Sequence, residues 1–116
     1  LINLETRQLT YEATLDLLGR HPDLRGIYCA GGGMEGAIAA VREARAPGEV
    51  ALVVNELTPE SRAALIGRHV TMVIGTPLPR LCDDLVRLAT EAVSGGLPPV
   101  QAQHFLRPDL HLPESV

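Results

Sequence analysis

Short runs of apolar residues alternate along this chain with longer stretches in which apolar residues recur every three or four positions. The short runs are typical of buried strands, and the longer stretches are typical of amphipathic helices. Strands are expected at residues 1–4, 26–30, 50–54 and 70–74, and helices at residues 10–21, 34–44, 58–67 and 77–93. This order predicts an α/β fold, a parallel sheet with helices on both faces and right-handed crossovers.

Capping residues mark the ends of several of these helices. Thr10 is expected to cap the first helix and Gly19 to close it. Thr58 followed by Pro59 predicts a helix start, because proline is favoured at the first helical position. The last helix has the most regular apolar spacing, formed by Leu78, Leu81, Leu85, Leu88 and Ala92.

Polar and glycine residues follow each of the predicted strands. In open α/β sheets, ligands bind beyond the carboxyl ends of the strands. Those ends are residues 5–7, 29–33, 55–58 and 75–76. We therefore expect one edge of the sheet to bind a ligand. Cys29 lies beside the glycines, where contact with a ligand and burial in the core are equal alternatives.

Gly31, Gly33 and Gly36 spell G-x-G-x-x-G between a predicted strand and a predicted helix. This is the dinucleotide-binding fingerprint, and Glu56 follows at about the separation expected of its acidic residue. A complete strand–helix unit precedes the motif, however, and Gly32 adds a glycine that the fingerprint does not require. The simpler alternative is that the glycines only let the strand and helix pack closely. An NAD-binding enzyme therefore stays open as an alternative at this point.

Charge and motif content narrow the classes of function. The chain has 116 residues, a length that suits one domain or one lobe of a larger protein. Ten basic and fourteen acidic residues give a net charge of −4, and no basic cluster appears, which argues against a nucleic-acid surface on this chain. The serines lie outside any G-x-S-x-G motif, and the four histidines lack metal-ligand spacing. We predict no catalysis, no metal and no cofactor.

The cysteines and the lack of targeting segments favour the cytoplasm. Cys29 and Cys82 lie far apart in different predicted elements, so reduced thiols are the simplest interpretation, with Cys82 on the apolar side of its helix and expected in the core. No apolar run reaches the length of a membrane span, and no signal-peptide pattern opens the chain. The first residue is not methionine, and we expect an N-terminal part to precede it.

Several stretches taken together resemble a known family. "LLGRHPDLRGIY", "NELTPESR" and "VIGTP" are similar to the effector-binding region of LacI-family transcriptional regulators, which have the type I periplasmic-binding-protein fold. The resemblance covers nearly the whole chain. It implies that residues 1–76 are the C-terminal lobe of a ligand-binding domain. Residues 77–116 would then hold the crossing helix of the neighbouring lobe and the C-terminal tail.

The resemblance also implies a set of ligand-binding residues. Glu56 matches the acid that grips paired sugar hydroxyls in the family, and Asn55 is its neighbour. A carboxylate that accepts from two vicinal hydroxyls is a physically sensible polyol contact. Gly31 and Gly32 stand where the family has an Asn-Asp pair. Thr76 stands near a usual glutamine, and Arg7 near a position that is often charged.

The function implied by the resemblance is the sensing of a small molecule, a sugar or related polyol. The ligand would bind between two lobes and modulate DNA binding by a helix-turn-helix upstream of these residues. The regulator would be a cytoplasmic homodimer that contacts operator DNA only through that upstream domain, with no membrane partner. The alternatives are a periplasmic sugar-binding transport protein and the NAD-binding enzyme. We further expect the apolar face of residues 77–93 to dock onto another copy of the chain or back onto the same lobe.

Overall fold

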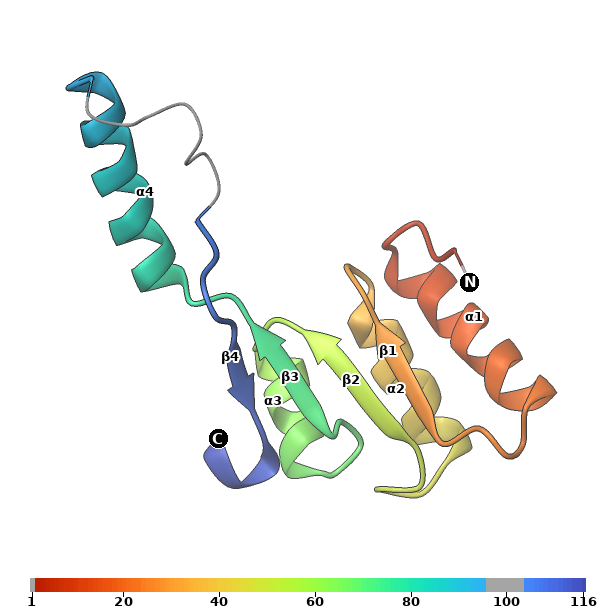
Figure 1. Ribbon diagram of the computed structural model, residues 1–116. Helices are drawn as coiled ribbons and strands as arrows, with labels where there is room; N and C mark the ends of the chain where they lie inside the picture. The colour runs from red at the N-terminus through yellow and green to blue at the C-terminus, as the bar shows by residue number, and fades with distance from the viewer. Residues whose placement is uncertain (1, 96–103) are drawn as a thin grey trace. The chain divides into compact units, whose positions relative to one another are not determined.

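The computed structural model describes residues 2–95 and 104–116. Its contacts divide the chain into two compact units. Unit 1 comprises Leu1–Gly75 and Leu110–Val116, and unit 2 comprises Thr76–Asp109. Figure 1 shows the order of the elements along the chain.

Unit 1 alternates helices and strands. Its elements are α1 (Arg7–Arg20), β1 (Gly26–Cys29), α2 (Met34–Ala44), β2 (Ala51–Asn55), α3 (Pro59–Ile66) and β3 (Met72–Gly75). Near the end of the chain it also contains β4 (Asp109–His111), apart from its first residue, and a 3-10 turn (Pro113–Ser115). The strands lie side by side in the order β1-β2-β3-β4. β1, β2 and β3 are parallel, with Tyr28 opposite Val53 and Asn55 opposite Ile74. The arrow of β4 points opposite to that of β3 in Figure 1.

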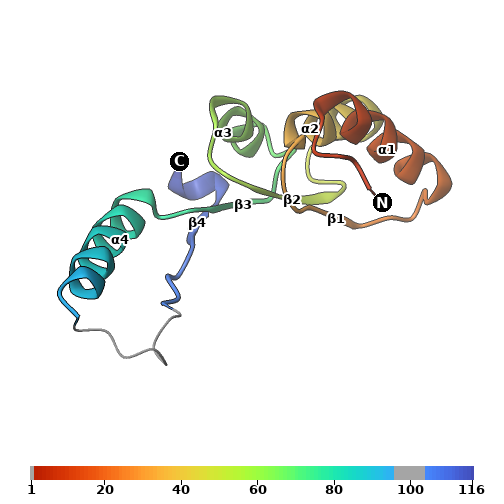
Figure 2. The same cartoon turned by 90° about the horizontal axis from the view of Figure 1, so that it is seen from above.

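The three helices of unit 1 all cover one face of the sheet, as Figure 2 shows. Side chains on that face, such as Leu52, Val54 and Val73, are completely buried, whereas Tyr28 on the opposite face is 58% exposed. The strand order explains this difference from the expected coverage of both faces. Because β1, β2 and β3 follow one another in a single direction, right-handed crossovers place α2 and α3 on the same side.

The start of the chain differs from the sequence prediction. Within the expected first strand, the described residues 2–4 have no strand structure. Helix α1 begins at Arg7, capped by Thr6, whose hydroxyl accepts from the Leu9 amide. The predicted cap, Thr10, is instead a buried helical residue whose hydroxyl donates to the Thr6 carbonyl at 2.6 Å. The helix also continues one residue past Gly19, to Arg20.

The start of α3 is as predicted. Thr58 caps the helix, Pro59 is its first residue, and Gly67 caps its end. Ser61 completes a reciprocal capping box, because its hydroxyl accepts from the Thr58 amide and its own amide donates to the Thr58 hydroxyl. Ser61 is fully buried, so this cap is protected from water.

Unit 2 contains α4 (Leu78–Val93). None of the residues of this helix is buried, and Cys82 is exposed, so the expectation of a core cysteine there is wrong. Polar contacts cover part of its surface: Arg80 pairs with Asp109 at 2.6 Å, and Asp84 contacts both Arg87 and His104. Hydrogen bonds from Arg87 and then His104 lower the pKa of the Asp84 carboxyl. No helix in the described part of the chain is long and apolar enough to cross a membrane.

Candidate functional site

The carboxyl ends of β1 and β2 lie at the same edge of the sheet, since the two strands are parallel neighbours. The loop from Ala30 to Gly33 follows β1, and Glu56 to Thr58 follow β2. The segment before α1 reaches the same place, because Asn3 donates a hydrogen bond to the Gly32 carbonyl at 3.1 Å. These three segments of unit 1 form the candidate site.

The glycines of this loop have two different roles. Gly33 precedes α2 with φ +83°, and a Cβ there would lie 2.2 Å from the Thr10 hydroxyl oxygen. A Cβ at Gly36 would lie 2.0 Å from the Arg7 carbonyl oxygen. Gly33 and Gly36 are therefore required by the close packing of α1 against α2. This steric role explains two of the three fingerprint glycines without a dinucleotide.

Gly31 and Gly32 face a different neighbour, Glu5. A Cβ at Gly31, where φ is +115°, would lie 2.6 Å from Glu5 Oε1. A Cβ at Gly32 would lie 3.0 Å from the Glu5 Cβ and 3.1 Å from its carbonyl oxygen. The two glycines thus leave room for the Glu5 side chain, which lies against the loop.

Glu56 has a backbone conformation that is uncommon outside glycine. Its φ is +64°, in the left-handed region. Two hydrogen bonds hold the backbone in this state: the Glu56 amide donates to the Ile74 carbonyl at 2.9 Å, and the Ser61 hydroxyl donates to the Glu56 carbonyl at 2.9 Å. The direction of the Glu56 Cα–Cβ bond is therefore set by the fold, and the residue is exposed.

Asn55, the last residue of β2, is half-buried beside Glu56. Its Oδ1 accepts a hydrogen bond from the Tyr28 hydroxyl at 3.3 Å. This contact orients the amide so that its Nδ2 group points away from Tyr28 as a donor. Asn55 and Glu56 thus place an amide donor and a carboxylate acceptor next to each other at the edge.

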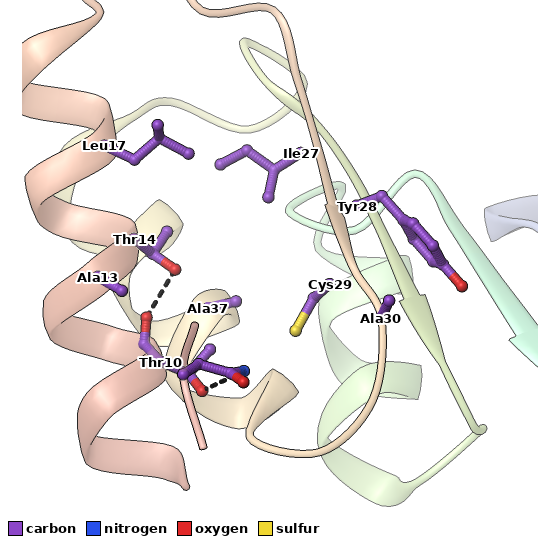
Figure 3. A pocket seen from close by; sticks show the side chains of 10 residues that line it. Thr10, Ala13, Thr14, Leu17, Ile27, Tyr28, Cys29, Ala30 and Ala37 are labelled. Atoms are coloured by element: carbon purple, nitrogen blue, oxygen red, sulfur yellow. Dashed lines mark hydrogen bonds between the residues drawn. The ribbon is translucent and has the colours of Figure 1, made fainter. Parts of the chain in front are cut away.

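The remaining predicted site residues are Cys29, Arg7 and Thr76. Cys29 is only 7% exposed and points toward α1 and α2, near Thr10 and Ala37 (Figure 3). Burial, and secondly the charge of Glu35, raise the pKa of its thiol. Arg7 begins α1 and lines a surface depression between α1 and α2. Thr76 follows β3 and is the first residue of unit 2.

A groove of about 280 Å³ lies between α1 and β1 (Figure 3). It is lined by Asn3, Thr10, Ala13, Thr14, Leu17, Ile27, Tyr28, Cys29, Ala30 and Ala37. The Thr10 and Thr14 hydroxyls donate to helix carbonyls one turn earlier, so they are already used within the protein. The groove is therefore mainly apolar and does not resemble a polyol site.

Sequence reasoning missed Glu5 and Tyr28. Glu5 belonged to a predicted strand end, but the described residues 2–4 before it form no strand, and its contact with Gly31 depends on the fold of residues 3–6. Tyr28 could have been found from strand periodicity, which places it on the same face as Asn55. Among the residues that the structure describes, no group of three His, Cys, Asp or Glu side chains could hold a metal ion.

Comparison with known proteins identifies similar chains. A family model described as "periplasmic binding protein domain" matches residues 2–97. No similar sequence was found among curated proteins. The chain is 16% identical to a solved structure of GanP, a glucose-galactose binding protein from Geobacillus stearothermophilus, with a TM-score of 0.85. The alignment covers 98% of this chain and 40% of GanP.

Two further solved structures are similar. An ABC transporter periplasmic solute binding protein from Actinobacillus succinogenes, with bound D-allose, is 18% identical with a TM-score of 0.80, covering 97% of this chain and 39% of that protein. A 5-methylthioribose transporter solute binding protein from Thermotoga lettingae is 18% identical with a TM-score of 0.73. The alignment covers 95% of this chain and 35% of that protein. The chain therefore spans about 40% or less of these proteins. The predicted α/β lobe is confirmed.

Proposed function

Since this chain belongs to the periplasmic binding protein domain family, we propose that it is the ligand-binding lobe of a sugar-binding transport protein. The carboxyl-end edge of unit 1 would hold the ligand, with Glu56 and Asn55 as its main contacts. The observation that carries the proposal is the exposed Glu56 at that edge, whose backbone is held in the left-handed region by the bonds to Ile74 and Ser61. The proposal includes no catalytic step.

The chemistry of the edge suits a sugar. A carboxylate accepts hydrogen bonds from two neighbouring hydroxyls, and such charge-assisted bonds are stronger than neutral ones. The Asn55 amide supplies a donor for a ring or hydroxyl oxygen. Gly31 and Gly32 keep the adjacent loop free of side chains of their own. The names of the similar structures, which include glucose, galactose, D-allose and 5-methylthioribose, support the same ligand class.

The test is calorimetry on the full-length protein that carries this chain, with a panel of D-galactose, D-glucose, D-allose and 5-methylthioribose. For a sugar that binds, Glu56→Gln is expected to weaken binding by about 1.5–3 kcal/mol, because a hydrogen bond to a charged group is lost. Glu60→Gln, a nearby exposed acid in the first turn of α3, is the control and should bind like the wild type. Unchanged affinity in Glu56→Gln would remove Glu56 from the site. NAD belongs in the panel, and tight NAD binding would favour the enzyme alternative.

A second candidate is the sensing domain of a LacI-type regulator, supported by the resemblance of "NELTPESR" and "VIGTP" to that family. The ligand and site would be the same, and the output would be DNA binding by a dimer in the cytoplasm. The similar structures named above include transport proteins, which favours the first candidate. Cell fractionation separates the two: a periplasmic protein supports transport, whereas a cytoplasmic protein whose DNA affinity responds to the sugar supports regulation.

A further inference from the structure

We propose that Glu5 is a second carboxylate of the ligand site and that it selects neutral, hydroxyl-rich ligands over their phosphorylated counterparts. The inference rests on the proposed function, because it assigns a specificity role at the same edge.

The glycine loop is shaped around Glu5. A side chain at Gly31 would displace the Glu5 carboxylate from its place, since the added Cβ would lie 2.6 Å from Oε1. At Gly32 it would meet the Glu5 Cβ and carbonyl at 3.0 and 3.1 Å. A loop with larger side chains would present its own groups to a ligand. In this chain the carboxylate of Glu5 occupies that place instead.

Hydrogen bonds to Asn3 hold the segment that carries Glu5. Asn3 Oδ1 accepts from the Glu5 amide at 3.1 Å, while Nδ2 donates to the Thr10 hydroxyl at 2.8 Å and to the Gly32 carbonyl at 3.1 Å. Glu5 itself has φ +56°, a left-handed conformation like that of Glu56. Both carboxylates thus leave the chain from constrained backbones at the same edge, and both residues are exposed.

The charge at this edge argues for the selectivity. The loop leads into the N-terminus of α2, a position where the helix dipole would otherwise favour an anionic group of a ligand. Glu5 places a negative charge there. The nearest basic residue in sequence, Arg7, lines the depression between α1 and α2 with Gln8, Tyr11, Gly36 and Ala39. A phosphate would therefore meet Glu5 and Glu56, whereas sugar hydroxyls can donate to both.

The test compares D-glucose, D-galactose and D-allose with glucose 6-phosphate by calorimetry on the full-length protein. The wild type should bind at least one neutral sugar and not the phosphate. Glu5→Gln should weaken binding of the neutral sugar by about tenfold, the effect of one charge-assisted hydrogen bond. It should also reduce the ratio between the affinities for the neutral sugar and for glucose 6-phosphate. Glu5→Asp keeps the charge but shortens the side chain, so it should weaken binding of the neutral sugar while binding of glucose 6-phosphate stays undetectable.

Matched variants separate the possible failures. Glu12→Gln, an exposed acid on α1 that accepts from Gln8, should behave like the wild type. If Glu56→Gln weakens binding but both Glu5 variants bind like the wild type, Glu5 is not a contact and this proposal is wrong. If the wild type binds glucose and glucose 6-phosphate with equal affinity, the proposed selection of neutral ligands is wrong. If no sugar binds, or if Glu56→Gln also has no effect, the proposed function fails. Circular dichroism of each variant distinguishes lost contacts from lost folding.

Discussion

At the scale of single residues, the site depends on backbone conformations that few residue types favour. Glu5 and Glu56 both have positive φ, where a side chain normally costs about 1–2 kcal/mol. Such strain persists only where the surroundings impose it, as the bonds to Ile74 and Ser61 do at Glu56. The fold therefore maintains these carboxylates at a cost to stability.

The Glu56→Gly variant tests whether the positive φ of Glu56 lowers the stability of the fold. Glycine adopts φ +64° without strain, so the free energy of unfolding should stay unchanged or rise by about 1 kcal/mol, while sugar binding is lost. Urea denaturation and calorimetry measure the two effects. Glu60→Gly is the matched control: it lies in α3, where glycine should lower the free energy of unfolding by about 1 kcal/mol. A comparable loss of stability in both variants would show that Glu56 is not strained.

The sequence was sufficient to select Glu56 and Asn55 as candidates, because both end an apolar strand at the expected binding edge. It placed Glu5 only within residues 5–7, at the end of a predicted strand, and did not select it as a ligand contact. That residue reaches the site through a turn held by Asn3, and contacts across such separations depend on tertiary structure. It also could not decide between the alternatives for Cys29, since only strand register shows that this side chain points toward α1 and α2.

At the scale of elements, the contact between α1 and α2 organises the glycine loop. The two helices approach so closely at Gly36 that a Cβ would lie 2.0 Å from the Arg7 carbonyl oxygen and 2.7 Å from the Tyr11 amide nitrogen. The predicted helix at residues 34–44 was correct, since its apolar positions recur regularly. The start of α1 was wrong, because Thr6 and Thr10 are equally good caps by type and only burial of Thr10 decides between them.

Gly36→Ala should destabilise the protein. The methyl group has no space between the helices, so α1 must shift, and we expect the free energy of unfolding to fall by about 1–3 kcal/mol. Gly19→Ala is the control within α1, where nothing lies within 4 Å of the added Cβ. It should stabilise the helix by about 0.5–1 kcal/mol. Equal effects of the two substitutions in urea denaturation would contradict the close packing.

A hydrogen bond from Tyr11 to Glu43 also joins these helices, at 2.5 Å. This bond, with smaller contributions from burial and from the charge of Glu43, raises the pKa of Tyr11 above the ordinary value of 10.0. Because the folded pKa is raised, the contribution of the bond to stability is complete below pH 10 and is lost as the pH rises through the folded pKa. Ultraviolet titration of the Tyr28→Phe variant should therefore show a tyrosine that ionises above pH 10, and adding Glu43→Gln should lower its pKa. Identical titrations of the two variants would exclude the bond.

At the scale of the whole molecule, the α/β class followed from the alternation of strands and helices, but the coverage of the sheet did not. With right-handed crossovers, helices reach both faces only if the strand order reverses, and β1, β2 and β3 do not reverse. Apolar spacing cannot show strand order, because both faces of the strands carry apolar residues such as Val53 and Val54. The proposed ligand edge therefore belongs to a sheet that the helices of unit 1 cover on one face only.

The 116-residue chain by itself should bind the sugar at least a hundredfold more weakly than the full-length protein. Ligand sites normally bury most of the ligand surface. Here Glu5 and Glu56 are exposed residues of one unit, and this chain spans about 40% of the length of GanP, the similar solved structure. Hydrogen bonds open to water contribute little, and the loss of three bonds of about 1 kcal/mol each corresponds to about a hundredfold in affinity. Calorimetry with the same sugar on both proteins measures the ratio. Equal affinities would show that unit 1 completes the site alone, and that no further residues of the longer protein contact the ligand.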